Sequence, residues 1–280
     1  EDITYILNSL KSNINKTEDE KIVIHIFNSK YFLDMKKIEN LPIGLFGDFY
    51  SQELSVCLIN NNDHKNLTNI FNKCNLNIKK ILLKGFVEGS YLSKKNKSCH
   101  TFYQIDINEN NSKISFFDND SLKFEENFNF GSNLINQDIS KVTSLKIDIV
   151  KKIINSIEFT ENISEDELIE KKLFENENYV KLKTKLLFEV AEARIHEILE
   201  LIILKNINFA SYEKRDVVIF LKISSRSHLM CFKDIYSSFL IKNRNFTLKF
   251  TENIPVQDLM INVNNLVHFG WKKEVIPVVN

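Results

Sequence analysis

The stretch FYQIDINENNSKISFFDND, residues 102–120, decides how the rest of the chain is interpreted. Apolar and polar residues alternate as in a β-strand, stop at the acidic, asparagine-rich run 106–112, and then alternate again. Two strands joined by such a run could carry a calcium loop, a phosphate-holding loop or a plain hairpin turn. The choice among these three largely decides whether the protein is an enzyme.

The residue types in this run argue against the first two alternatives. Asp106, Asn108 and Asn110 alternate like the first three ligands of an EF-hand. However, position six lacks the turn glycine, and position twelve is Phe117 where a bidentate glutamate is needed. A phosphate loop needs backbone N–H groups that approach an anion closely, which glycine permits. Since residues 106–112 contain no glycine, the local sequence favours a plain hairpin turn, which Asn and Asp tolerate.

The composition indicates a globular protein with about two domains. Of the 280 residues, 43% are hydrophobic, and 6 Gly and 3 Pro leave little room for flexible linkers. The 37 basic and 37 acidic residues cancel, which disfavours a nonspecific nucleic-acid binder. Four scattered cysteines are expected to be reduced thiols, and no apolar run approaches the roughly 18 residues of a membrane span. The sequence starts without Met, in a helical pattern, and we expect it to be part of a longer protein.

Hydrophobic periodicity predicts an α+β unit followed by a second mixed unit. The expected strands are 21–27, 30–34, 52–60, three strands of a meander within 101–130, 216–224 and 246–252. The expected helices are an opening amphipathic helix, one around 67–74, one at 131–142, several over 144–206 and a final helix from 256.

The long helix expected from about Tyr179 has two apolar stripes when its residues are placed at steps of about 100°. The first stripe consists of Leu187, Ala191, Ile195, Ile198 and Ile202. The second consists of Leu186, Val190, Leu201 and Leu204, and it is interrupted by Arg194 and Glu197. Periodicity alone favours an ion pair on the helix flank. The alternative is a groove whose charges orient an amphipathic partner segment.

The order of elements and several phrases resemble FtsA, a bacterial cell-division family of the actin superfamily. KIVIHIFNSKYFLDMKKIENLPIGLFGDFY looks like the strand V-I-H-V-I-P-x-x-Y and the turn P-I-G-x-x-G of that family. FNFGSNLINQDIS resembles the segment P-x-G-G-x-x-x-T-x-D-I-A, with Gly131, Asp138 and Ile139 retained. EVAEARIHEILELI resembles the helix E-x-x-E-x-R-x-x-E-I. The resemblance runs through the whole sequence, which would correspond to the latter part of a family member.

This resemblance implies a mixed α/β fold of the actin-like (ribonuclease H-like) kind with an inserted α+β subdomain, called 1C. The implied subdomains are 1–78 as 1C-like, 79–143 with 207–252 as 2A-like, 144–206 as 2B-like, and 253–280 as a return to 1A. Most of subdomain 1A and the C-terminal membrane helix of the family would lie outside this sequence.

The resemblance also bears on the hairpin. The family's nucleotide-binding hairpin reads D-I-G-G-G-T-T-D, and the corresponding residues 106–113 read DINENNSK. The carboxylate of Asp106 is kept, the glycines and threonines are gone, and Glu109 would bring negative charge towards phosphates. The adenosine-side T-G-G appears as ISS at 223–225. We therefore expect no cofactor; if a full-length protein did keep ATP with Mg²⁺, Asp106 and Gly131 are the candidate binding residues.

By resemblance, the expected function is a cell-division scaffold that links FtsZ, the tubulin-like ring protein, to the cytoplasmic face of the bacterial inner membrane at the division site. Arg194 and Glu197, flanked by Val190 and Leu201, would hold the C-terminal tail of FtsZ. Residues 1–78 would contact other divisome proteins, and the chain would self-associate into filaments. Membrane contact would pass through a segment outside this sequence.

No nucleophile, acid–base pair or metal-binding constellation is visible in the sequence, so no catalytic activity is expected. Two other functions remain open. One is an active actin-like ATPase that keeps ATP through altered loop chemistry. The other is a generic α/β binding module.

Overall fold

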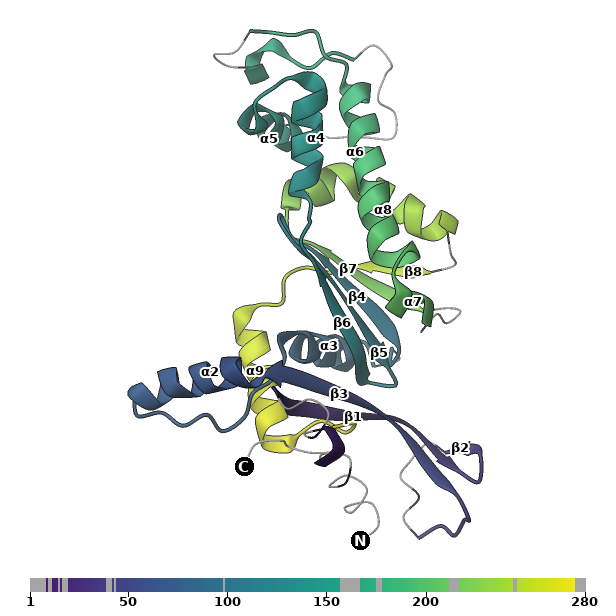
Figure 1. Ribbon diagram of the computed structural model, residues 1–280. Coiled ribbons are helices and arrows are strands. Elements are labelled where there is room, and N and C mark those ends of the chain that lie inside the picture. The colour runs from purple at the N-terminus through teal and green to yellow at the C-terminus, as the bar shows by residue number, and fades with distance from the viewer. Residues whose placement is uncertain are drawn as a thin grey trace. The chain divides into compact units, whose positions relative to one another are not determined.

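The computed structural model has a mixed α/β fold, which confirms the predicted fold class, and it divides into two compact units (Figure 1). The described residues are 9, 12–14, 16, 20–38, 42, 44–97, 99–156, 167–174, 178–211, 217–243 and 246–274. The first unit comprises Glu1–His100, Phe117–Lys123 and Ile254–Asn280, and the second comprises Thr101–Phe116 and Phe124–Asn253. The four predicted subdomains remain a prediction, since these two units divide the chain more coarsely.

An antiparallel sheet of order β2-β1-β3 forms the centre of the first unit. Its strands are β1 (Lys21–Leu33), β2 (Lys36–Ile38) and β3 (Tyr50–Asn60). The prediction of two strands where β1 lies was wrong, because the polar pair Asn28–Ser29 does not end the strand. A register shift between Asn28 and Lys30 accommodates this pair as a bulge, and Ser29 Oγ donates to the Glu53 carbonyl at 3.3 Å.

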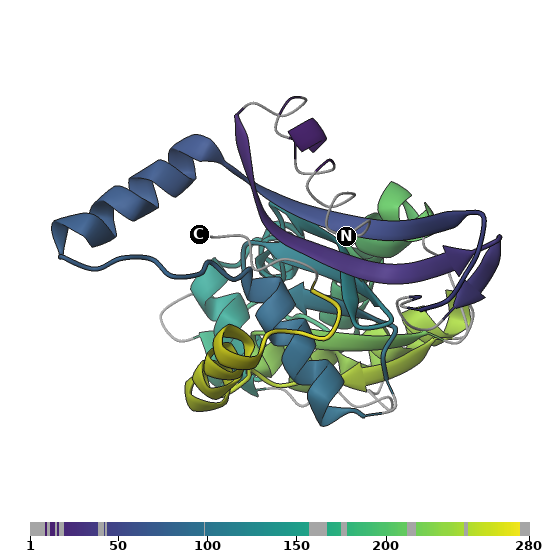
Figure 2. The same ribbon diagram turned by 90° about the horizontal axis from the view of Figure 1, so that it is seen from below.

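Three helices complete the described part of the first unit: α2 (Asn61–Lys73), α3 (Lys84–Lys95) and α9 (Val256–Phe269). Helix α2 continues from the end of β3 and has no buried residue, although its apolar residues follow the predicted helical spacing (Figure 2). Helix α3 packs against α9. The predicted opening helix lies largely outside the described residues.

The sheet of the second unit has the order β6-β5-β4-β7-β8. Its strands are β4 (Phe102–Ile107), β5 (Ser112–Asp118), β6 (Ser121–Phe128), β7 (Val218–Ile223) and β8 (Thr247–Phe250). The first three are neighbours in chain order, which confirms the predicted meander, whereas β4 pairs with β7 and β7 with β8 in parallel. All residues of β4 are buried, as is typical of a central strand.

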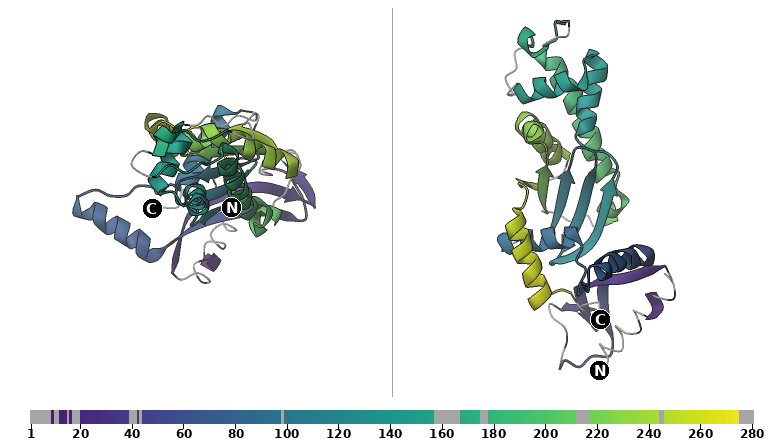
Figure 3. Two further views of the ribbon diagram at one scale, coloured as in Figure 1. Left: turned by 90° about the horizontal axis from the view of Figure 1, so that it is seen from above. Right: turned by 90° about the vertical axis from the view of Figure 1, so that its left-hand side faces the viewer.

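Helices of the second unit enclose one hydrophobic core, and α8 packs against β7 and β8 (Figure 3). They are α4 (Asn133–Thr143), α5 (Ile147–Ser156), the 3-10 turn η1 (Lys171–Phe174), α6 (Thr184–Leu199), the π-helical turn η2 (Glu200–Leu204), α7 (Ile207–Ser211) and α8 (Arg226–Asn243).

The predicted core face of the long helix is confirmed. Its five residues are no more than 1% exposed: Leu187, Ala191, Ile195, Ile198 and Ile202. The predicted start at Tyr179 was too early, because the preceding residues pair with another segment. Leu168 and Lys183 form an antiparallel bridge, and the Thr184 N–H donates to the Glu167 carbonyl at 2.9 Å.

Candidate functional site

The turn between β4 and β5 is held together by its own asparagines. The Asn108 N–H donates to the Asn111 carbonyl at 2.9 Å, and the two side-chain amides are joined at 2.7 Å. Ser224 Oγ donates to the Asn108 side chain at 2.5 Å. This is the hairpin turn that the local sequence favours, braced by the residue that follows β7.

Gly131 explains why the hairpin lies so close to helix α4. A Cβ atom at this position would come within 2.2 Å of the Asn108 carbonyl oxygen and 2.7 Å of the Glu109 carbonyl oxygen. The same approach lets the Ser132 N–H donate to the Asn108 carbonyl at 2.9 Å, and the Asn133 N–H to the Glu109 carbonyl at 2.8 Å. Free N–H groups at a helix N-terminus favour anions. Here the hairpin backbone takes up the donors of Ser132 and Asn133.

Asp106 is buried and lies between two lysines. Lys222 Nζ is 3.1 Å from one carboxylate oxygen, and Lys113 Nζ is 3.7 Å from the same oxygen. The Gln104 amide nitrogen approaches the carboxylate at 3.3 Å. A carboxylate that holds Mg²⁺ needs its oxygens directed at the cation. Asp106 instead neutralises two ammonium groups inside the second unit.

A polar cavity of about 140 Å³ lies between the hairpin, α4, α5 and the start of α8. Its polar lining residues are Glu109, Ser132, Asn136, Lys151, Asn155, Ser225, Ser227 and His228. Small-molecule sites commonly occupy about 300–1,000 Å³. The volume of this cavity is therefore smaller than a nucleotide site requires. Ser225, which lines it, belongs to the tripeptide 223–225 that the resemblance places on the adenosine side.

His228 is the most strongly perturbed group of this cavity. Its side chain is buried, and its Nε2 lies 3.0 Å from Asn136 Oδ1, which identifies Nε2 as the donor. Burial, followed by the nearby charge of Lys151, lowers the pKa of His228 to about 4. Neither His228 Nδ1 nor Ser132 Oγ has a hydrogen-bond partner among the described residues. A role for this histidine beyond the core or surface could not be predicted from the sequence, because its partner Asn136 lies on another helix.

ATP with Mg²⁺ does not fit the residues of the second unit. The hairpin has no glycine, the first N–H groups of α4 are used by the hairpin backbone, and Asp106 is paired with lysines. Glu109 adds a further acid to the cavity where phosphates would need donors. Of the two predicted cofactor-binding residues, Gly131 acts in backbone packing and Asp106 in ion pairing.

The predicted partner-binding residues lie on α6 and η2. Arg194 Nη1 donates to Glu197 at 2.6 Å, which is the predicted i,i+3 pair, and Arg194 Nε makes a short contact with Asp138 of α4. Glu197 is exposed, whereas Val190 and Arg194 are half-buried and Leu201 is at the exposed limit. Asp138 was missed as a partner because 56 positions separate it from Arg194. The remaining guanidinium N–H groups of Arg194 have no partner among the described residues.

Comparison with known proteins finds similarity only at the level of the fold. No family model matches the sequence, and no curated protein matches it either. A chain of the PilM–PilN type IV pilus biogenesis complex aligns with 8% identity and a TM-score of 0.48 over 96% of this chain and 71% of its own length. MreB5 of Spiroplasma citri bound to AMPPNP gives 10% identity and 0.47 over 74% of this chain and 65% of its own.

The ethanolamine utilization protein EutJ from Carboxydothermus hydrogenoformans aligns with 9% identity and a TM-score of 0.38, over 65% of this chain and 54% of its own. This chain therefore spans about half of EutJ and slightly less than two thirds of MreB5. Members of the actin-like superfamily, which the sequence resemblance names, are among these structures, but they do not single out FtsA.

None of the described helices is long and apolar enough to cross a membrane. Within the described ranges, no group of three or more His, Cys, Asp or Glu side chains is placed to hold a metal ion.

Proposed function

We propose that this chain is an actin-like scaffold of the FtsA kind, which binds the C-terminal tail of FtsZ at the cytoplasmic face of the bacterial inner membrane and hydrolyses no ATP. The observation that supports the absence of hydrolysis is the closed hairpin: Gly131 lets α4 approach the 108–109 carbonyls, and the N–H groups of Ser132 and Asn133 donate to them. The sequence resemblance assigns phosphate binding to this hairpin. Filament formation and divisome contacts through residues 1–78 belong to the same proposal and rest on the sequence resemblance.

The 280-residue chain is expected to show no ATP turnover above a buffer blank and no rise in Tm with Mg-ATP, because the groups that would hold the phosphates are paired within the chain. Turnover is measured as phosphate release, and Tm by scanning fluorimetry on the same preparation. Turnover that Asp106→Asn removes while the fold persists would favour the second candidate, an active ATPase. A rise in Tm with a full-length protein alone would place the nucleotide contacts outside this sequence.

The binding of the FtsZ tail would depend on Arg194. Its free N–H groups can take a carboxylate of the tail, since guanidinium and carboxylate match as a fork, while Val190 and Leu201 offer apolar surface beside them. Glu197 already accepts from Arg194 and would orient it. Asp138 holds Nε from the opposite side, so the guanidinium is fixed before a partner arrives.

Arg194→Ala is expected to weaken binding of a labelled FtsZ-tail peptide by about 1–2 kcal/mol, the cost of a hydrogen bond to a charged group. Fluorescence anisotropy measures the affinity for wild type, Arg194→Ala and Glu197→Ala. Glu189→Ala, which removes an exposed acid of the same helix, is the matched control and should bind like wild type.

Arg194 also ties α6 to α4 through Asp138, so Arg194→Ala is expected to cost about 1 kcal/mol of stability as well. Urea unfolding of each variant separates this loss from the loss of affinity. Equal peptide affinities in wild type and the three folded variants would show that Arg194 and Glu197 do not bind the peptide and only stabilise the packing of α6 on α4.

A further inference from the structure

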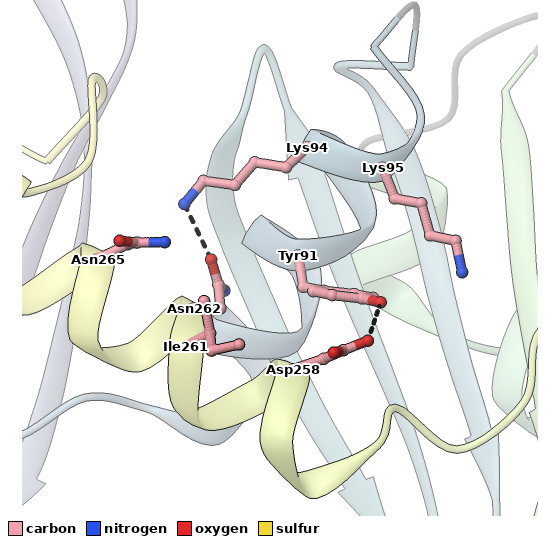
Figure 4. A pocket seen from close by; sticks show the side chains of 7 residues that line it. All are labelled: Tyr91, Lys94, Lys95, Asp258, Ile261, Asn262 and Asn265. Carbon is pink, nitrogen blue, oxygen red and sulfur yellow. Dashed lines mark hydrogen bonds between the residues drawn. The ribbon is translucent and has the colours of Figure 1, made fainter.

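A second cavity, of about 430 Å³, lies between α3 and α9 within the first unit (Figure 4). Its lining residues are Tyr91, Lys94, Lys95, Asp258, Ile261, Asn262 and Asn265. None of these residues takes part in the hairpin or in the proposed FtsZ contact. The cavity is large enough for a side chain and the adjoining backbone of a bound segment.

The floor of the cavity is a built polar network. Asn262 is buried, and its amide nitrogen donates to the Val87 carbonyl at 2.9 Å and reaches Ser90 Oγ at 2.8 Å. Its oxygen accepts from Lys94 Nζ at 2.9 Å. The Lys94 ammonium also lies 5.6 Å from the centre of the Trp271 ring. The Lys94 ammonium is therefore held over the cavity, although the residue as a whole is exposed.

The cations of this cavity lack anionic partners. No carboxylate among the described residues lies within 4.0 Å of Lys94 or Lys95, and burial lowers the pKa of Lys94. Lys95 Nζ lies 5.9 Å from the Tyr91 ring centre. The Asn265 amide makes no hydrogen bond to the described residues, and Figure 4 shows it directed towards Lys94. The Lys94 ammonium and the Asn265 amide thus offer unused donors near each other, whereas Lys95 extends away from them in Figure 4.

The lining of the cavity combines a net positive charge with one exposed apolar side chain. Asp258 accepts from the Tyr91 hydroxyl at 2.9 Å and lines the same cavity. Two lysines and one aspartate leave a single net positive charge, which attracts an anionic group. Ile261 is 62% exposed at the cavity wall, so an apolar group next to the anion would cover it.

We propose that this cavity binds an acidic side chain of a partner protein, with Lys94 and Asn265 receiving its carboxylate and Ile261 covered by a neighbouring aliphatic residue of the same segment. The site is independent of the proposed FtsZ contact on α6. It adds a second docking point, on the first unit, for a segment in which Asp or Glu adjoins Leu, Ile or Val.

Trp271 is the single tryptophan of the sequence, so its fluorescence reports on the Lys94 side of the cavity. The probe is N-acetyl-Leu-Asp-Leu-amide, compared with N-acetyl-Leu-Asn-Leu-amide and with inorganic phosphate. We expect a saturable change with the Asp peptide and an affinity about tenfold weaker for the Asn peptide, as for the loss of a charged hydrogen bond.

The variants are designed to separate charge from folding. Lys94→Gln should weaken the Asp peptide about tenfold, and Lys94→Arg should retain most of the affinity. Lys84→Gln, an exposed lysine at the start of the same helix, is the matched control and should leave binding unchanged. If Lys94→Gln does not fold, Asn265→Asp serves instead, because it adds a repelling carboxylate without removing a hydrogen bond to the described residues.

Three results would each overturn the proposal. They are equal affinities for the Asp and Asn peptides, unchanged binding in a folded Lys94→Gln or Asn265→Asp variant, and tighter binding of phosphate than of the Asp peptide. An absent response of Trp271 to the Asp peptide counts against it in the same way.

Discussion

Gly131→Ala is expected to lower the free energy of unfolding by about 3 kcal/mol, the upper range for a group forced into a filled space. The added methyl would come within 2.2 Å of a backbone carbonyl oxygen, that of Asn108, which cannot rotate away as a side chain can. Relief requires α4 to move off the hairpin, and this breaks the hydrogen bonds from Ser132 and Asn133. Urea unfolding followed by circular dichroism measures the loss.

Ser132→Ala is the control for this prediction. Its hydroxyl is buried and has no partner among the described residues, so its removal should change stability by less than about 0.5 kcal/mol. The two substitutions are at adjacent positions. Gly131→Ala adds one carbon atom, and Ser132→Ala removes one oxygen atom. If Gly131→Ala is as stable as Ser132→Ala, the close approach of hairpin and helix is not a constraint on the fold.

Stability is expected to fall by about 3 kcal/mol between pH 6.5 and pH 4 through His228 alone. Its pKa is about 4 in the folded protein, against about 6.5 for an unfolded histidine. Above pH 6.5 neither state binds the proton, so this contribution is fully present. As the pH falls below 6.5 the unfolded chain takes up a proton that the folded chain does not, and the folded state loses stability until about pH 4.

The measurement compares the free energy of unfolding at pH 7.5 and pH 4.5 in wild type and in His228→Gln, whose amide can still donate to Asn136. Other groups also titrate with folding: the pKa of Glu53 is lowered to about 2, and that of Glu274 is lowered as well. The difference between wild type and variant isolates His228. His268→Gln, at an exposed position on α9, should keep the wild-type pH dependence. A His228→Gln variant with that same dependence would contradict the prediction.

Local periodicity predicted most elements of the fold, because burial of one face leaves a regular pattern. The core stripe of α6, the meander and the parallel strand β7 are cases in point. The prediction failed at Asn28–Ser29, where two polar residues look like a break but form a bulge inside one strand. Helix α2 shows the converse: its apolar spacing is regular, yet no residue of it is buried in the described structure.

The candidate sites were harder to predict, because their members are distant in sequence. Arg194 on α6 contacts Asp138 on α4, and His228 on α8 forms a hydrogen bond with Asn136 on α4. The absence of glycine from the hairpin was readable from the sequence. That the N–H groups of Ser132 and Asn133 donate to the hairpin carbonyls could be seen only in the structure.

The pairing of Asp106 has a consequence for how this protein could change over evolutionary time. Three glycines placed in the turn would free its backbone but would leave two ammonium groups, Lys113 and Lys222, on the carboxylate that a metal would need. Replacing those lysines first would leave a buried carboxylate without its counter-charges, which destabilises a fold. Each single step towards a nucleotide site is therefore neutral or harmful unless the others have already occurred. A nucleotide site at this hairpin would therefore require several coordinated substitutions.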